Sequence, residues 1–325
     1  MSTALEGLGA PAVLGSESAV AAIPNTLDFA SSLPTPSNVP RPHGPWLRLG
    51  KPKEIALWLQ CVFAEYLGEF MGTWMFVSIG VCVNAQYVLV TKDDSGRFFA
   101  MNWIWGFSLM MGAYTSAGVS GSHLNPAMTL ACLLYRRFSL WKAIGFWTAQ
   151  IGGAYVGAAF SYIYWLPAIH QYDGHIKRAT GPTGIGRIFY SESTDYESNA
   201  MRLWIETYGT AIFVFVLFAL NDRKNNPLAG PIIPIIRGLT MAAITTSYGS
   251  PAGYAINPIR DFGPRLFLLS AGYGTVTFTE HSAYFWIPLC GPLFGGVLGG
   301  FMYQILIRPL LMDMVVERGG VSATH

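Results

Sequence analysis

The segment GYAINPIRDFGPR, residues 253–265, contains the residues with the clearest chemical potential in this chain. It places Arg260 and Asp261 side by side, directly after a long uncharged stretch. The arginine side chain is a permanent cation with five N–H donors in a planar fork, which suits binding to oxygen atoms. If this stretch lies in a membrane, the two charges are costly there and indicate a functional site.

An Asn-Pro pair precedes this arginine, and the first half of the chain contains the same pair. Asn is a strong N-cap and Pro suits the first helical position. Asn125 and Asn257 are therefore each expected to begin a short helix, over about 125–135 and 257–269. Each side-chain oxygen would accept a helix N–H, which leaves the amide NH₂ groups as donors toward a lumen. Two ordinary helix caps in loops are the alternative.

The composition predicts a membrane protein. Of the 325 residues, 52% are hydrophobic and only 12% are charged, whereas about a quarter of the residues in soluble domains are charged. Crossing the hydrocarbon core takes about 20 apolar residues, and several uncharged runs reach this length. Six spans are expected, at about 55–85, 98–118, 140–165, 202–221, 232–250 and 283–307.

Charge and cysteine usage argue against other classes. The net charge is +2, and no basic cluster is interleaved with aromatic residues, so a nucleic-acid partner is not expected. The four cysteines show no metal-binding or disulfide spacing, and neither a metal nor a cofactor is expected.

The six spans form two groups of three, each with one short Asn-Pro helix. An odd number of spans inverts the second copy, which predicts an inverted repeat with its site at the midplane. Basic residues flanking the spans place both termini in the cytoplasm.

The predicted fold is an all-α membrane protein with six transmembrane helices and two re-entrant half-helices. The predicted organisation is a disordered Ser/Pro-rich tail at 1–50, a channel domain at 51–308 and a cytoplasmic tail at 309–325. Within the channel domain, repeats at about 55–165 and 202–308 would be joined by an extracellular loop at 166–200.

A glutamate stands early in the first span of each half, in Glu65-Tyr-Leu-Gly and Glu206-Thr-Tyr-Gly. Irregular backbone at membrane depth needs internal hydrogen-bond partners, so both carboxylates are expected to hold backbone N–H groups before the half-helices. Glu69, one helical turn after Glu65, is a weaker candidate for the same network, and His123 is expected to be structural. The alternative is a proton- or ion-coupled transporter of a small polar solute that uses Glu65, Glu206 and His123.

The segment SGSHLNPA, residues 120–127, and the segment GYAINPIRDFGPR together resemble the major intrinsic proteins, and within them the aquaglyceroporins. The resemblance covers about residues 55–308. It implies an aquaporin-like fold, a homotetramer in the lipid bilayer of the plasma membrane, and no enzymatic activity. It further implies passive conduction of water and small uncharged polyols such as glycerol, with exclusion of ions and protons.

The resemblance also implies a constriction, whose residues are identified by their distance in sequence from the Asn-Pro pairs. The aromatic residues of this constriction, Trp105 and Tyr254, would form an apolar corner for the carbon chain of a polyol, opposite the donors of Arg260. Either ring could instead belong to the core. Three positions depart from the family pattern: Ile259 replaces alanine, Thr245 replaces the glycine common in glycerol facilitators, and Tyr254 replaces phenylalanine. Asp261 is expected to anchor its loop. Its alternative role is to neutralise a packing arginine.

The expected site residues are Asn125, Pro126, Ala127, Asn257, Pro258 and Ile259 in the Asn-Pro motifs, Trp105, Thr245, Tyr254 and Arg260 in the selectivity filter, and Glu65, Glu206, His123 and Asp261 in the supporting scaffold.

Overall fold

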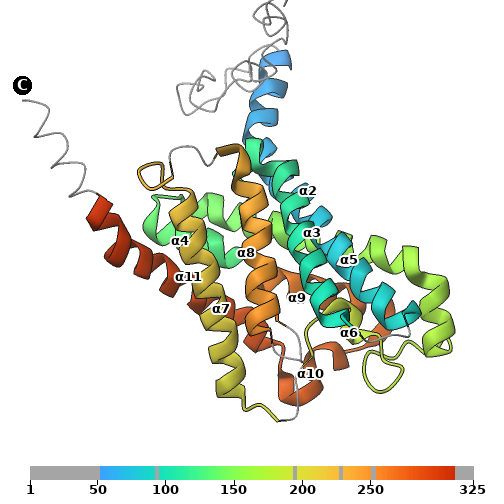
Figure 1. Ribbon diagram of the computed structural model, residues 1–325. Helices are drawn as coiled ribbons and strands as arrows, with labels where there is room; N and C mark the ends of the chain where they lie inside the picture. The colour runs from blue at the N-terminus through green and yellow to red at the C-terminus, as the bar shows by residue number, and fades with distance from the viewer. Residues whose placement is uncertain (1–51, 92–94, 193–195, 227–229, 250–253, 312–325) are drawn as a thin grey trace, which may run out of the picture. The chain divides into compact units, whose positions relative to one another are not determined.

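The computed structural model describes residues 52–91, 95–192, 196–226, 230–249 and 254–311. The chain divides into a unit that ends at Cys61 and a unit that begins at Val62, and the architecture below concerns the second. All regular elements in the described ranges are helical (Figure 1). The predicted N-terminal tail and most of the predicted C-terminal tail lie outside the described residues.

The helices follow the predicted segments closely. The longer ones are α2 (Pro52–Ala85), α3 (Arg97–Ser120), α5 (Leu140–Asp173), α7 (Asn199–Leu220), α8 (Ile233–Tyr248) and α11 (Trp286–Met302). The shorter ones are α4 (Pro126–Tyr135), α6 (Gly186–Phe189), α9 (Pro258–Leu268) and α10 (Val276–Ala283). Single π-helical turns follow at Gln86–Val90, Leu269–Tyr273 and Tyr303–Ile307, and a 3₁₀ turn at Gly230–Ile232 precedes α8.

Two differences from the sequence expectation concern the segments between the long helices. Helix α5 continues to Asp173 and contains Pro167, so it extends beyond the predicted end at 165. Helices α6 and α10 lie in segments for which no helix was predicted. Both are short, and their sequences have no long apolar run that would have indicated them.

Three of the described helical segments are long and apolar enough to cross a membrane by length and composition, namely Phe63–Val90, Asn199–Leu220 and Trp286–Leu311. Large apolar side chains also face outward from the helices. Trp141 is 80% exposed, Tyr164 is 76% exposed and Ile163 is 66% exposed. Exposed apolar surface of this extent is unusual for a soluble monomer and suits contact with lipid.

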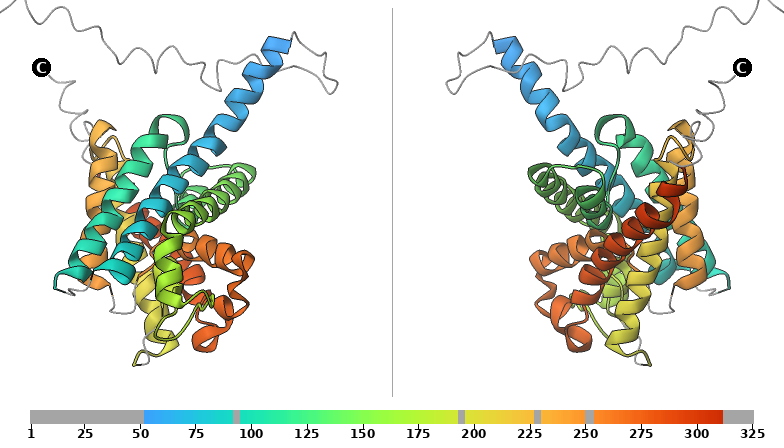
Figure 2. Two further views of the ribbon diagram at one scale, coloured as in Figure 1. Left: turned by 90° about the vertical axis from the view of Figure 1, so that its right-hand side faces the viewer. Right: turned by 90° about the vertical axis from the view of Figure 1, so that its left-hand side faces the viewer.

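Glycines allow pairs of helices to approach closely. Helices α3 and α8 run side by side (Figures 1 and 2). A Cβ atom added to Gly106 would lie 2.5 Å from the carbonyl oxygen of Gly238, and the reverse substitution meets the same distance. Helices α7 and α11 meet in the same manner, because a Cβ on Gly299 would lie 2.2 Å from the carbonyl oxygen of Ala211. Such contacts hold each helix pair close together, and α7 and α11 also contact the short helix α4.

Candidate functional site: two Asn-capped helices and a buried arginine

Both short helices begin with the cap that the sequence predicts. The Oδ1 atom of Asn125 accepts the backbone N–H of Ala127 at 2.9 Å, and the Oδ1 atom of Asn257 accepts that of Ile259 at 3.2 Å. Pro126 and Pro258 occupy the first helical positions, where a missing N–H costs nothing. Ile259, which stands where the family has alanine, is 1% exposed and therefore packs at the start of α9.

The two asparagines also connect the two short helices to each other. The Nδ2 atom of Asn125 donates to the carbonyl oxygen of Ile256 at 3.1 Å, and the Nδ2 atom of Asn257 donates to that of Leu124 at 2.7 Å. The sequence expectation left both amide groups entirely for the lumen. In the structure each amide uses one N–H in this cross-connection, and one N–H of each remains as a donor.

The backbone before each helix has an uncommon conformation. Leu124 has φ 50° and Ile256 has φ 55°, in the left-handed region that is costly for residues with large side chains. This conformation turns the carbonyl of each residue toward the asparagine of the opposite helix. It persists because buried carboxylates hold the neighbouring N–H groups.

In the first half of the chain, that carboxylate belongs to Glu69. Its Oε1 atom accepts the backbone N–H of His123 and its Oε2 atom that of Leu124, each at 2.7 Å. The hydroxyl of Ser120 and the amide of Gln150 also donate to it at 2.7 Å. Glu69 is fully buried. Its four hydrogen bonds replace the water that a buried carboxylate would otherwise need.

The expectation that Glu65 does this is therefore wrong. Glu65 lies one turn earlier on α2, is partly exposed and forms an ion pair with Lys142. In the second half, Glu206 has the expected contacts, because it accepts the N–H groups of Ala255 at 2.8 Å and Ile256 at 2.9 Å. The local sequence does not distinguish the two glutamates, since Glu65-Tyr-Leu-Gly and Glu69-Phe-Met-Gly both have the spacing of Glu206-Thr-Tyr-Gly.

His123 is enclosed by a hydroxyl and two aromatic rings. Its Nδ1 atom lies 3.1 Å from the hydroxyl of Thr129. The ring packs against Phe138 and Phe146, with centroid distances of 5.0 Å and 5.2 Å. These contacts fix the ring beside the segment that leads into α4.

Arg260 and Trp105 are brought together from distant parts of the chain. The guanidinium carbon of Arg260 lies 4.6 Å from the centroid of the Trp105 ring. Both side chains are buried, and the Nη1 atom of Arg260 donates to the hydroxyl of Ser191 at 2.9 Å. The indole N–H of Trp105 donates to Asn84 at 3.0 Å. The arginine is thus positioned by an aromatic face on one side and a loop hydroxyl on the other.

Two other expected filter residues are held by separate contacts. The hydroxyl of Tyr254 donates to the carbonyl of Ile205 at 2.8 Å, and its ring lies so close to Gly209 that a Cβ there would overlap it. The hydroxyl of Thr245 donates to the carbonyl of Met241 at 2.9 Å, within its own helix α8. This bond turns the polar atom of Thr245 toward its own backbone.

Asp261 anchors the loop before α7, in line with the sequence expectation. Its Oδ2 atom accepts the backbone N–H of Ser191 at 2.7 Å, and its Oδ1 atom accepts Nε of Arg265 at 2.5 Å. The distance from Asp261 to Arg260 is longer, at 3.9 Å. Arg265 also forms an ion pair with Glu280 at 3.2 Å. Asp261 therefore serves mainly as the partner of Arg265 and of the loop.

Sequence reasoning did not find Ser191, Asn84 or Glu280. Each lies outside the Asn-Pro motifs, and nothing in its local sequence marks it. Within the described residues, no group of His, Cys, Asp and Glu side chains is arranged to hold a metal ion.

Comparison with known proteins places this geometry in a family. The family model for major intrinsic protein matches residues 59–303. Aquaglyceroporin-2 of Rhizophagus irregularis is 39% identical over 245 residues, which cover 75% of this chain and 77% of the relative. Aquaporin-6 of Laccaria bicolor is 33% identical over 296 residues, 87% of this chain and 90% of the relative.

A solved structure agrees with the sequence matches. The X-ray structure of the aquaglyceroporin from Plasmodium falciparum superposes with a TM-score of 0.68 at 28% identity, and the match covers 76% of this chain and 98% of that one. The helical fold with its two Asn-capped short helices is that of an integral membrane channel protein, not an enzyme. The chain belongs to the major intrinsic protein family.

Proposed function

We propose that this protein is a passive channel for water and small uncharged polyols such as glycerol, and that it excludes ions and protons. The observation that carries the proposal is the position of the Arg260 guanidinium, 4.6 Å from the Trp105 ring and three residues after the Asn257 cap. In this arrangement the guanidinium offers N–H donors to solute hydroxyls, and the aromatic ring offers apolar contact to the carbon chain of the solute. The relatives named for water and glycerol transport support this assignment.

Exclusion of cations and protons follows from the same residues. The N-terminal ends of α4 and α9 meet through the asparagine cross-connection, and each helix end carries roughly half a positive elementary charge. Arg260 adds a full charge on the same path. A cation or a migrating proton at this point meets an electrostatic barrier, while a neutral hydroxyl is bound by the remaining asparagine N–H groups.

The selectivity filter of the proposed channel consists of Trp105, Thr245, Tyr254 and Arg260. Tyr254 stands where the family has phenylalanine, and its hydroxyl is bound to Ile205, so the ring edge can still act as an apolar wall. Thr245 fills space that glycine would leave open. The proposed filter is thus narrower on its α8 side than that of a glycerol facilitator with glycine at this position.

The proposed architecture has six transmembrane helices and two re-entrant half-helices in an inverted repeat, with repeats at about 55–165 and 202–308. The segment between α5 and α7 is extracellular, both termini are cytoplasmic, and the protein is a homotetramer of the plasma membrane. The basic residues at the ends of the helices support this orientation. The tails at 1–50 and 309–325 flank the channel domain.

Stopped-flow light scattering on proteoliposomes tests the function directly. The expected result is a rise in water and glycerol permeability above protein-free vesicles, unaffected by an imposed pH gradient. Solute uptake that follows the pH gradient and runs uphill would instead identify a coupled transporter. Glu69 and Glu206 argue against that outcome, because their carboxylates already accept backbone and side-chain hydrogen bonds.

A further inference from the structure

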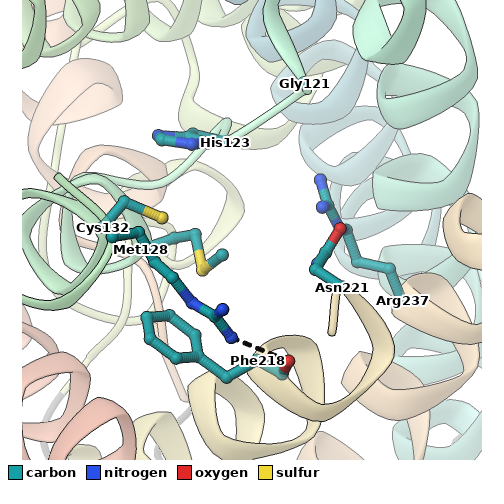
Figure 3. A pocket seen from close by; sticks show the side chains of 8 residues that line it. Gly121, His123, Met128, Cys132, Phe218, Asn221 and Arg237 are labelled. Atoms are coloured by element: carbon teal, nitrogen blue, oxygen red, sulfur yellow. Dashed lines mark hydrogen bonds between the residues drawn. The ribbon is translucent and has the colours of Figure 1, made fainter. Parts of the chain in front are cut away.

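A cavity of about 230 Å³ lies beside α4 (Figure 3), and Arg260 is not among its lining residues. Its lining comes from the segment before α4, from α4 itself, from the end of α7 and from the start of α8. The lining residues are Gly121, His123, Met128, Cys132, Arg136, Phe218, Asn221 and Arg237. Since the flanking basic residues place these helix ends at the cytoplasmic side, the cavity is at the inner mouth of the proposed channel.

Arg237 is the unusual member of this lining. It lies on α8 and is 2% exposed. Its Nη1 atom donates to the carbonyl oxygen of Ser122 and, at 2.7 Å, to the Ser122 hydroxyl. Its Nε atom has no hydrogen-bond partner, and no acidic side chain in the described part of the chain forms an ion pair with it. A buried guanidinium without an ion-pair partner is costly, and an anion bound beside it would reduce this cost.

Arg136 supplies a second cation to the same cavity. Its Nη2 atom donates to the carbonyl of Phe218 at 3.2 Å, and its guanidinium carbon lies 4.8 Å from the Phe218 ring. These contacts hold the group at the cavity wall and leave further N–H donors on its fork. Figure 3 shows Asn221 and Arg237 on one side of the open space and Cys132 and Met128 on the other.

No acidic side chain in the described part of the chain forms an ion pair with either arginine. The charge of Glu69 acts on Arg237 from a distance, but its oxygens accept four hydrogen bonds from Ser120, His123, Leu124 and Gln150. Asp222 accepts the hydroxyl of Tyr303 at 3.1 Å and the backbone N–H of Lys224 at 3.0 Å, and it does not line the cavity. With no acidic residue in the lining, the walls concentrate a positive potential.

We propose that this cavity is a binding site for a small oxyanion of the phosphate class, held between Arg237 and Arg136. Guanidinium forks match the oxygen geometry of such an anion, and the free N–H of Asn221 adds a neutral donor. The anion lies against His123 and Met128, on either side of the Asn125 cap, and therefore obstructs the inner mouth. Cytoplasmic phosphate thus reduces flux. Only this effect on flux rests on the proposed function.

Binding is measured separately from flux. Purified full-length protein in detergent is titrated with inorganic phosphate at constant ionic strength, and thermal unfolding is recorded against chloride. A ligand that binds only the folded state raises the unfolding midpoint with concentration. The flux of glycerol in proteoliposomes is then measured with phosphate or chloride on both sides, and a saturable reduction by phosphate is expected.

Three variants identify the site. Arg237→Gln keeps an amide donor for Ser122 but removes the charge. Arg136→Gln likewise keeps an amide donor, for the carbonyl of Phe218, and removes the charge of this half-buried arginine. Each is expected to weaken phosphate binding about tenfold, the loss of one charge-assisted pair. Arg223→Gln is the matched control, because Arg223 is exposed and lies outside the lining. It should leave the phosphate response unchanged.

The phosphate group could be free or carried by a serine of the chain's own N-terminal tail. Phosphatase treatment and deletion of residues 1–45 separate these sources, because only a tail phosphate is removed by them. A phosphate response that is absent in all preparations, or equal in the wild type and both cavity variants, would overturn the proposal. Binding without any measurable flux would retain the anion site and remove the proposed function.

Discussion

The amide nitrogen of Asn125 lies 3.1 Å from the carbonyl oxygen of Ile256, which is 131 residues away in the chain. The reciprocal bond joins Asn257 to Leu124. Each asparagine therefore caps its own short helix with its oxygen and holds the opposite segment with its nitrogen. The same side chain thus caps a helix, joins two distant segments of the chain and leaves one N–H as a donor in the proposed pore.

Asn125→Asp separates these roles. The carboxylate still accepts the N–H of Ala127 and caps α4, but it cannot donate to Ile256. The free energy of unfolding should fall by about 1–3 kcal/mol, because the buried carbonyl of Ile256 loses one of its two donors and keeps only the bond from the Thr210 hydroxyl at 3.3 Å. The new negative charge should also admit cations. Thermal unfolding and sodium leak from proteoliposomes measure both effects. Asn102→Asp, at a half-buried position of α3 whose side chain bonds only to its own helix, is the control, and equal leak in the two variants would contradict the expectation.

Glu69→Gln and Glu65→Gln form a matched pair. Removing the Glu69 charge weakens the hydrogen bonds from His123, Leu124 and Ser120, so the free energy of unfolding should fall by about 2–5 kcal/mol. Glu65→Gln loses only a partly exposed ion pair to Lys142, worth about 0–1 kcal/mol. Thermal unfolding and the yield of folded protein are the measurements. A larger loss from Glu65→Gln would mean that Glu65 holds the backbone after all.

Ser191→Ala removes the hydroxyl that accepts a hydrogen bond from Arg260. The backbone N–H of Ser191 still reaches Asp261, so the loop should remain folded. The arginine should become less well positioned, and the ratio of glycerol to water permeability should change by about tenfold, because a hydrogen bond to a charged group is worth about 1.5 kcal/mol. Ser191→Thr keeps the hydroxyl and should restore the ratio. Identical ratios in the wild type and the alanine variant would remove Ser191 from the site.

Thr245→Gly tests the α8 side of the filter. The threonine hydroxyl is bound to Met241 within its own helix, so its loss leaves no distant donor unpaired. The change should open the constriction and raise glycerol uptake relative to water. Glycine in a helix interior costs about 1 kcal/mol, so thermal unfolding is measured alongside. Thr240→Gly is the control, because Thr240 lies on the same helix and its hydroxyl also bonds to a carbonyl of that helix. An equal change in that variant would show that helix stability, and not pore width, is responsible.

The scaffold was only partly predictable from the glutamates. Glu65 and Glu69 are one turn apart on α2 and stand in the same Glu-x-x-Gly frame. Helical periodicity assigns both to nearly one face, and it cannot say which side chain reaches the segment before α4. Packing against α3 and α5 sets the position of the helix, and only Glu69 then reaches the N–H groups of His123 and Leu124.

The sequence alone determined the class of the protein and the local chemistry of its motifs. Long uncharged runs require a membrane or a core, and Asn followed by Pro begins a helix through contacts within three residues. Such properties depend on neighbours in the chain and can be read without a fold. The tertiary structure decided which distant groups meet: Ser191 with Arg260, Asn84 with Trp105, and Arg237 with Ser122. These contacts depend on the rotation and position of packed helices, which no local pattern encodes.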